Sequence, residues 1–381
     1  MEIGLSSDDI PIEVLSRLPA KTLLGLKCVS RGWHHLISDP AFIRVQIQRS
    51  KEAISGFFFQ EKFHWCDADI ETLSYIPIGR EQAVVKHTVL DFLPEKVVIM
   101  DSSNGLICCR SCMPAPDPVI YVCNPSNKEW VTLKWAKPEK SKSLALLFDP
   151  FCNPIDTPMN FKVISVHQIE TDTDLYFSFK IYCSEKGAWR ESKENCFCHY
   201  DLFKRKGVFA GGVLHWLTNG DQILTFNVEN EQCQLINLPT STIECNDLPE
   251  MCIGEAEGHL HYIMISTSGL QVWILEDYSG PKWVLKDSIS LAMMEEENPQ
   301  FLYNLLQRTA GRVTFDMIPW IEPLAFKDGL LLMRVSSRMY LYHLESRRMK
   351  ELCSLTKLGP NSLVYPTVLP YSMSLIRLAY P

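Results

Sequence analysis

Cysteine and histidine, the residues that most often bind metal ions, cluster in two short stretches of this 381-residue chain. The first stretch holds Cys108, Cys109 and Cys112, and the second holds Cys196, Cys198 and His199. Zinc sites usually combine two such pairs at fixed spacings, and neither stretch has the second pair. Free cysteine is among the most buried residue types. We therefore predict that these cysteines are reduced and pack in the core, and that the protein binds no metal or other cofactor.

Histidines inside apolar segments are the next candidates for chemistry. His215 follows Gly212 by three residues, and His261 follows Gly258 by three residues, with His259 on the same face of the predicted strand. Equivalent positions elsewhere in the chain hold cysteine or leucine, which indicates strand register rather than metal ligation. The sequence also lacks the GxSxG, HExxH and phosphate-loop motifs. We predict a protein without catalytic residues of its own.

The composition excludes several classes of partner. With 46% hydrophobic and 22% charged residues the chain is globular, and its net charge is −8. It therefore carries no basic footprint for nucleic acid and no attraction to an anionic membrane surface. The start of the chain is short and acidic, and no apolar run approaches the roughly 20 residues that span a bilayer. We expect no signal peptide and a location in the cytoplasm, the nucleus or both.

Residues 9–45 carry apolar side chains at helical spacings. Pro11 suits the first turn of a helix, and Pro19 ends that helix because proline lacks an N–H group. Two further stripes follow, and Asp39-Pro40 opens another short helix. Helices over about forty residues bury only part of their apolar surface internally. The remainder is expected to meet a partner protein or the rest of the chain.

Short strand-like runs follow residue 50, and four of them share one layout. In each, a turn ends in glycine and is followed by two apolar strands, a polar turn and a third strand; the four glycines are Gly105, Gly212, Gly258 and Gly329. We expect positive φ or a tight approach at these glycines. Gly212 and Gly258 lie 46 residues apart, and periods of 40 to 50 residues are typical of propeller blades.

These patterns predict a mostly β protein with a small N-terminal α-helical domain at residues 1–48 and a β-propeller of about six blades at residues 57–381. The apolar tail, residues 363–378, is expected to complete a blade with N-terminal residues and so close the ring. The alternative architecture is a pair of two-sheet sandwiches. It provides no reason for the repeated glycine-led units.

The N-terminal stretch IPIEVLSRLPAKTLLGLKCVSRGWHHLI resembles the F-box, and most closely the F-box of land-plant proteins. The resemblance implies docking on the small Skp-type adaptor, and through it on the cullin and RING subunits, of a ubiquitin ligase. By position it assigns eight residues to adaptor binding: Pro11, Leu15, Leu18, Pro19, Leu23, Leu24, Val29 and Trp33. Some of these must instead form the small core of the F-box.

The later phrases SSNGLICC, CNPSNKEWVTL, GGVLHWL and AFKDGLLLMRV resemble the F-box-associated C-terminal domains of plant F-box proteins. That resemblance implies a kelch-like propeller that binds a target protein. We therefore expect the substrate-recognition subunit of a Skp–cullin–F-box ubiquitin ligase, with an unidentified target protein and no binding to nucleic acid or membrane. The alternatives are a carbohydrate-active propeller enzyme with a helical cap, or an interaction scaffold outside any ligase.

Overall fold

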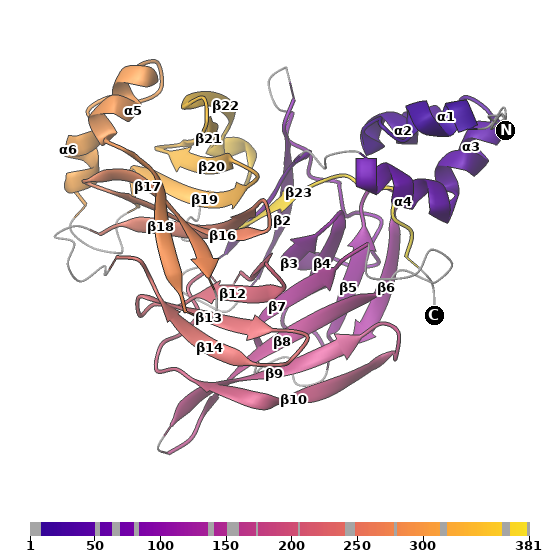
Figure 1. The fold of residues 1–381 in the computed structure, drawn as a ribbon, viewed down its shortest axis with the longest axis horizontal. Coiled ribbons are helices and arrows are strands. Elements are labelled where there is room, and N and C mark those ends of the chain that lie inside the picture. The colour runs from indigo at the N-terminus through magenta and orange to yellow at the C-terminus, as the bar shows by residue number, and fades with distance from the viewer. Residues whose placement is uncertain are drawn as a thin grey trace, which may run out of the picture.

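Four short helices precede a body of β-strands (Figure 1). The computed structural model describes residues 9–49, 54–62, 69–79, 84–135, 141–150, 160–172, 174–204, 206–240, 248–277, 280–312, 318–359 and 366–378. The helices are α1 (Asp9–Leu15), α2 (Ala20–Leu26), α3 (Arg31–Ser38) and α4 (Pro40–Arg49). We call α1–α4 the helical module. As predicted, its first helix ends before Pro19. None of the helices in the described part of the chain has the length and apolar character needed to cross a bilayer.

Side-chain caps set where the later helices of the module begin. The Ser30 hydroxyl accepts a hydrogen bond of 3.1 Å from the Trp33 N–H at the start of α3. The Asp39 carboxylate accepts one of 2.8 Å from the Ala41 N–H, and Pro40 occupies the first position of α4. The predicted helix start at Asp39-Pro40 is therefore confirmed.

Three sheets each consist of four consecutive antiparallel strands. The first contains β3 (Val97–Ser103), β4 (Leu106–Ser111), β5 (Val119–Asn124) and β6 (Glu129–Lys134). The second contains β7 (Ser141–Phe148), β8 (Phe161–Glu170), β9 (Leu175–Cys183) and β10 (Ala188–Phe197). The third contains β11 (Val208–Ala210), β12 (Val213–Leu217), β13 (Gln222–Asn227) and β14 (Cys233–Asn237).

The next eight strands form a single sheet. Its strands are β15 (Glu250–Ala256), β16 (His259–Ser266), β17 (Gly269–Asp277), β18 (Lys282–Ile289), β19 (Ile321–Lys327), β20 (Leu330–Val335), β21 (Arg338–His343) and β22 (Arg348–Ser354). Between β18 and β19 the chain forms α5 (Leu291–Glu297) and α6 (Leu305–Ala310), and after β22 it forms η3 (Leu355–Lys357). A three-stranded sheet in the order β2 (Asp69–Pro77), β1 (Gly56–Lys62) and β23 (Thr367–Tyr371) completes the described strands.

Two-residue turns join the first two strands in four of the repeated units. Their central pairs are Asn104-Gly105, Gly211-Gly212, Glu257-Gly258 and Asp328-Gly329, and all eight residues have φ between 45° and 84°. Positive φ at both positions matches the right-handed twist of the flanking strands. The positive φ predicted for the four glycines is therefore confirmed.

The ring closes between the two ends of the propeller. Strand β23 pairs antiparallel with β1, with Phe58 opposite Leu369. The first strands of neighbouring units also meet: β3 contacts β7, β11 contacts β15, and β23 contacts both β3 and β19. The predicted closure by the C-terminal residues is confirmed, and the sheets surround a common centre in Figure 1.

The expectation of about six blades is corrected, because the separate sheets of the described residues are fewer. The reason lies where β15 meets β19. These strands pair in parallel through Gly254 with Phe326 and Glu255 with Lys327, which merges two antiparallel sets of four strands. A Cβ at Gly254 would stand 2.1 Å from the Phe326 carbonyl oxygen. The absence of a side chain therefore permits the contact.

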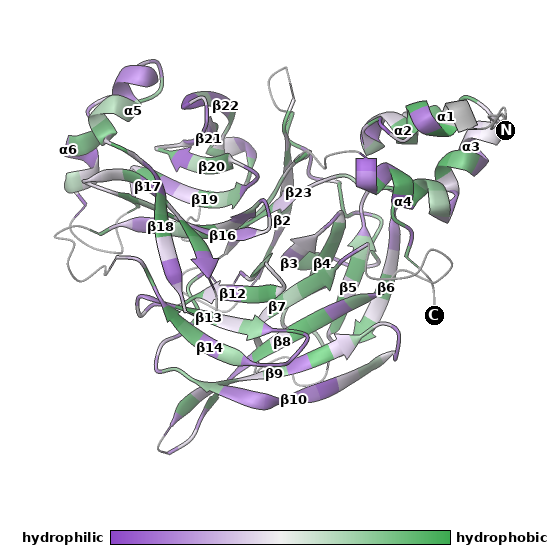
Figure 2. Cartoon of the chain, viewed as in Figure 1, coloured by the Kyte–Doolittle hydropathy of each residue, from purple (hydrophilic) through white to green (hydrophobic). Residues whose placement is uncertain are grey.

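Apolar side chains fill the space between successive sheets. The rings of Phe179 in β9 and Phe226 in β13 stack with centroids 4.2 Å apart. The indole N–H of Trp216 in β12 donates a hydrogen bond of 3.0 Å to the Ser143 hydroxyl in β7. Figure 2 shows hydrophobic residues along the inner strands and hydrophilic residues along the outer strand β10. The propeller therefore provides a rigid body on which the helical module rests.

Candidate functional site

The helical module shares a hydrophobic core with the propeller. One buried cluster combines apolar residues of β4 to β8 and of the C-terminal end of the chain with seven residues of the module: Leu15, Ala20, Leu23, Ile37, Phe42, Ile43 and Ile47. Burial of apolar side chains against the sheet fixes the module in place. The apolar surface that remains outside this cluster is the candidate site.

The structure separates the eight predicted adaptor-binding residues into buried and accessible ones. Leu15 and Leu23 are 4% and 0% exposed and lie in the shared core. Three residues at the edge of the core are partly buried, namely Leu18, Leu24 and Trp33. Pro19 and Val29 are exposed, Val29 at 62%. Pro11 belongs to α1, but its side chain lies outside the described side chains. Adaptor binding by these residues stays a prediction.

Val14 is an accessible residue that sequence reasoning did not assign to the site. It is 58% exposed, whereas its neighbour Leu15 is buried. Consecutive residues point about 100° apart on a helix, so both side chains cannot face the same core. The spacing of Val14, Leu15 and Leu18 marks one apolar stripe, and the sequence does not show which edge of that stripe faces the propeller.

Charged side chains tie the first and last helices of the module together. The Glu13 carboxylate accepts hydrogen bonds from Arg17 at 2.6 Å and from Arg49 at 2.5 Å. These bonds, first from Arg17 and then from Arg49, hold the pKa of Glu13 below its ordinary value. Gln46 also donates a hydrogen bond of 3.2 Å to the Leu18 carbonyl. Exposed ion pairs of this kind contribute little to stability. The Glu13–Arg49 and Gln46–Leu18 contacts do join α1 and the turn after it to α4.

Residues 372–378, which we call the C-terminal tail, lie against the outer part of the first four-stranded sheet. The Asn124 amide donates a hydrogen bond of 2.7 Å to the Ile376 carbonyl. The Glu129 carboxylate accepts bonds of 2.9 Å from the Leu378 N–H and 3.0 Å from Arg377 Nε. The tail side chains Leu375, Ile376 and Leu378 belong to the same cluster as the helical module. The tail therefore lies at the junction of the two domains.

The pKa of Lys27, at the end of α2, is affected by charged residues of the tail and the propeller. Partial burial and the positive charge of Arg377 lower the pKa of Lys27, and Glu129 acts in the opposite direction. Lys27 belongs to the helical module, Arg377 to the tail and Glu129 to strand β6. Lys27 of the helical module therefore lies close enough to the tail and to strand β6 to feel their charges.

The candidate histidines and cysteines are mainly structural. Burial lowers the pKa of His215 to about 4, and its Nδ1 lies 3.1 Å from the Val208 carbonyl oxygen. His261 is buried against the Phe326 ring, and burial lowers its pKa as well. Core packing is confirmed for four cysteines, Cys108, Cys109, Cys196 and Cys198, whereas Cys112 is half-buried. Within the described ranges, no group of three or more His, Cys, Asp or Glu residues is arranged to hold a metal ion.

Buried charges also meet among the inner strands of the propeller. Glu322 in β19 lies 2.9 Å from Lys204 Nζ and 2.9 Å from Arg334 Nη2. Burial alone would raise the pKa of Glu322, but Lys204 and Arg334 outweigh it and lower that pKa. Each oxygen of Glu322 therefore faces a cation, as a buried charge requires. Glu250 pairs with Arg312, but burial and the nearby Glu322 charge outweigh this pair and raise the pKa of Glu250.

The structure joins a helical module with accessible apolar residues to a ring of antiparallel sheets. Comparison with protein families identifies this combination. The F-box domain model matches residues 8–44. The model described as F-box protein At3g26010-like, beta-propeller, matches residues 75–305. The chain belongs to this plant F-box β-propeller family.

Two relatives from Arabidopsis thaliana match over nearly the whole chain. F-box protein At5g49610 is 27% identical, with 94% of each chain covered. F-box protein At5g07610 is 25% identical, with 92% of this chain and 86% of the relative covered. The likeness therefore includes both the helical module and the propeller.

Proposed function

We propose that this protein is the substrate-recognition subunit of a Skp–cullin–F-box ubiquitin ligase. In this role the helical module binds the Skp-type adaptor, which connects it to the cullin and RING subunits. The observation that carries the proposal is that the module matched by the F-box model keeps Val14 and Val29 exposed after its own core is complete. Such side chains are available to join the apolar core of a protein–protein interface.

We propose that the propeller holds the target protein and supplies no catalysis of its own. A target bound to a rigid body near a ubiquitin-conjugating enzyme experiences a raised effective concentration. The shared core and the C-terminal tail support a fixed orientation of the two domains. A fixed orientation would select which lysines of the target are modified. Such a ligase would act in the cytoplasm, the nucleus or both.

The division of the chain into two domains is part of this proposal. Domain bounds of 1–48 and 57–381 are consistent with α4 ending at Arg49 and β1 beginning at Gly56.

Adaptor binding is the direct test. We expect the full chain, co-expressed with a plant Skp-type adaptor, to retain it on affinity purification. Replacing Val14 and Val29 together with glutamate should abolish retention, because buried carboxylates without partners are strongly unfavourable at an interface. Folding should be preserved, because substitutions at exposed positions usually change stability by less than about 0.5 kcal/mol.

Val84→Glu is the matched control. Val84 is 73% exposed and lies outside the helical module, so this variant should bind the adaptor normally. Full retention by the double variant would contradict the proposed interface. Adaptor binding without co-purification of cullin would instead favour a scaffold outside the ligase.

A further inference from the structure

The outer edge of the closing sheet has open backbone positions. Strand β2 is the last strand of its three-stranded sheet, whereas three of the other sheets have four strands and one has eight. On its outer side Tyr75 pairs with Lys86, through N–H to carbonyl bonds of 2.8 and 3.0 Å. Peptide groups of alternate residues point to the same edge of a strand, so that of Leu73 faces outward as well. Beyond Leu73 the register with β1 shifts, so the alternation ends there. In the part of the chain that the structure describes, no further strand pairs with this edge.

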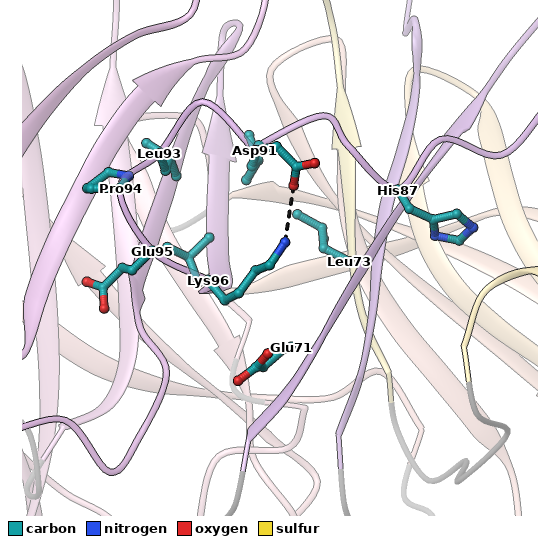
Figure 3. Close-up of a pocket in the computed structure, with 10 residues that line it drawn as sticks. Glu71, Leu73, His87, Asp91, Leu93, Pro94, Glu95 and Lys96 are labelled. Atoms are coloured by element: carbon teal, nitrogen blue, oxygen red, sulfur yellow. Dashed lines mark hydrogen bonds and ion pairs between the residues drawn. The ribbon is translucent and has the colours of Figure 1, made fainter.

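A cavity of about 390 Å³ adjoins this edge (Figure 3). It lies between β2 and residues 87–97, which lead into β3. Four of its apolar side chains are buried and form a hydrophobic floor: Leu73, Leu90, Leu93 and Val97. The cavity therefore combines an apolar base with an accessible β-strand edge, which is the arrangement used by proteins that bind a peptide as an added strand.

The rim of the cavity is acidic. Glu71 projects from β2, and Asp91 forms an ion pair with Lys96 across 3.3 Å, drawn in Figure 3. Both members of that pair are exposed, so water screens it and it contributes little. The Lys96 ammonium group is therefore held only weakly beside Asp91, and a cation from another molecule could take its place.

A third carboxylate is held firmly in position. Glu95 accepts hydrogen bonds of 2.8 Å from the Ser111 hydroxyl and 2.7 Å from the Tyr121 hydroxyl. Nearby Asp69 is already matched by Arg110, at 2.6 and 2.7 Å.

The Cys112 thiol lies beside this rim, among the same carboxylates. Burial raises its pKa to about 11, and the carboxylates of Asp69, Glu71 and Glu95 add to the rise against the opposing charge of Arg110. The surroundings therefore favour a cationic ligand.

We propose that the β2 edge and this cavity bind an extended segment of the target protein that carries a lysine or arginine side chain. The segment pairs with the peptide groups of Leu73, its aliphatic carbons cover the apolar floor, and its cation displaces Lys96 beside Asp91 and the Glu71 side chain. This inference rests on the proposed role as a substrate receptor, and it specifies the chemistry of the target.

Binding can be measured directly with a synthetic peptide and the full chain. The probe is a fluorescein-labelled octapeptide of alternating lysine and valine with blocked ends, followed by fluorescence anisotropy. We expect binding that weakens as salt is raised, because the rim charges are exposed. A peptide with glutamate in place of lysine should not bind. A lysine peptide with N-methylated valines should not bind either, since it lacks the donors that pair with a strand edge.

Two variants of the receptor should shift the affinity in opposite directions. Glu71→Gln should weaken binding about two- to fivefold, the range that corresponds to one exposed ion pair. Lys96→Gln should strengthen binding by a similar factor, because it frees Asp91. Lys180→Gln is the matched control: Lys180 pairs with Glu191 at the same 3.3 Å, on β9 and β10, and its loss should leave the affinity unchanged.

Absence of binding, equal binding of the lysine and glutamate peptides, or equal affinity of Glu71→Gln and Lys96→Gln would overturn the proposal. Adaptor retention is read on the same proteins. If the peptide result fails while the adaptor is retained, the peptide site is wrong and the ligase role is unaffected. If the adaptor is lost from the unmodified chain, the ligase role itself is wrong.

Discussion

Replacing Ile376 with alanine tests whether the C-terminal tail holds the two domains together. The Ile376 side chain is 0% exposed and lies in the cluster that includes Leu15 and Leu23. Its carbonyl accepts hydrogen bonds of 2.7 Å from Asn124 and 2.8 Å from Asn127, and these involve the backbone, so alanine leaves them in place. The substitution therefore removes side-chain packing alone.

The expected loss follows from cavity formation. Truncating a buried isoleucine to alanine costs about 2–5 kcal/mol of unfolding free energy. Globular proteins gain about 2.1 cal/mol/K of entropy per residue on unfolding, which is about 0.8 kcal/mol/K for this chain if it unfolds as one unit. The melting temperature should therefore fall by about 3–6 °C.

Differential scanning calorimetry measures this shift. Ile318→Ala is the matched control, because Ile318 is exposed and its truncation leaves no buried cavity. We expect the control to melt within about 1 °C of the unmodified protein, in keeping with the small effect of surface substitutions. Equal melting temperatures for Ile376→Ala and Ile318→Ala would refute the reasoning that the tail is part of the shared core.

Two further predictions concern the propeller. Gly105 and Gly258 have similar φ values of 84° and 79°, but a Cβ at Gly105 would stand 2.3 Å from the Ser374 Cβ, and one at Gly258 would meet nothing within 4 Å. Gly105→Ala should therefore lower the melting temperature more than Gly258→Ala does. Equal losses would show that the tail can move away from residue 105 at little cost. Burial holds the pKa of His215 at about 4, below its ordinary 6.5, so the unfolded chain binds this proton first and stability falls as pH drops from about 6.5 to 4. The loss of unfolding free energy over this pH range corresponds to on the order of 3 kcal/mol. His215→Leu should reduce it, as measured by urea titrations at several pH values. An unchanged pH dependence would contradict the view that buried His215 causes the loss.

The elements that sequence reasoning predicted well are those with strong local causes. Prolines and capping side chains mark the helix boundaries, as at Asp39 and Pro40. Glycines at positive φ mark the two-residue turns, as at Gly258 and Gly329. Both kinds of signal depend on a few neighbouring residues, so they can be recognised without the fold.

The number of sheets required information that no single segment contains. Gly254 shows no turn pattern, since its importance comes from the approach of Phe326, 72 residues later in the sequence. Gly105 was recognised as a turn residue, but its contact with Ser374 depends on where the tail runs. Contacts between distant segments decide these features.

The candidate sites divide in the same way. The residues of the segment 9–45 were enough to show a resemblance to the F-box, because that resemblance depends on residue order within one short stretch. Helix periodicity by itself indicated only short amphipathic helices. Only packing against the propeller decided that Leu15 is covered while Val14 and Val29 remain accessible. The acidic cavity beside β2 likewise exists because ring closure brings β23, β1 and β2 together and leaves one strand edge open, an outcome of tertiary structure that local patterns do not encode.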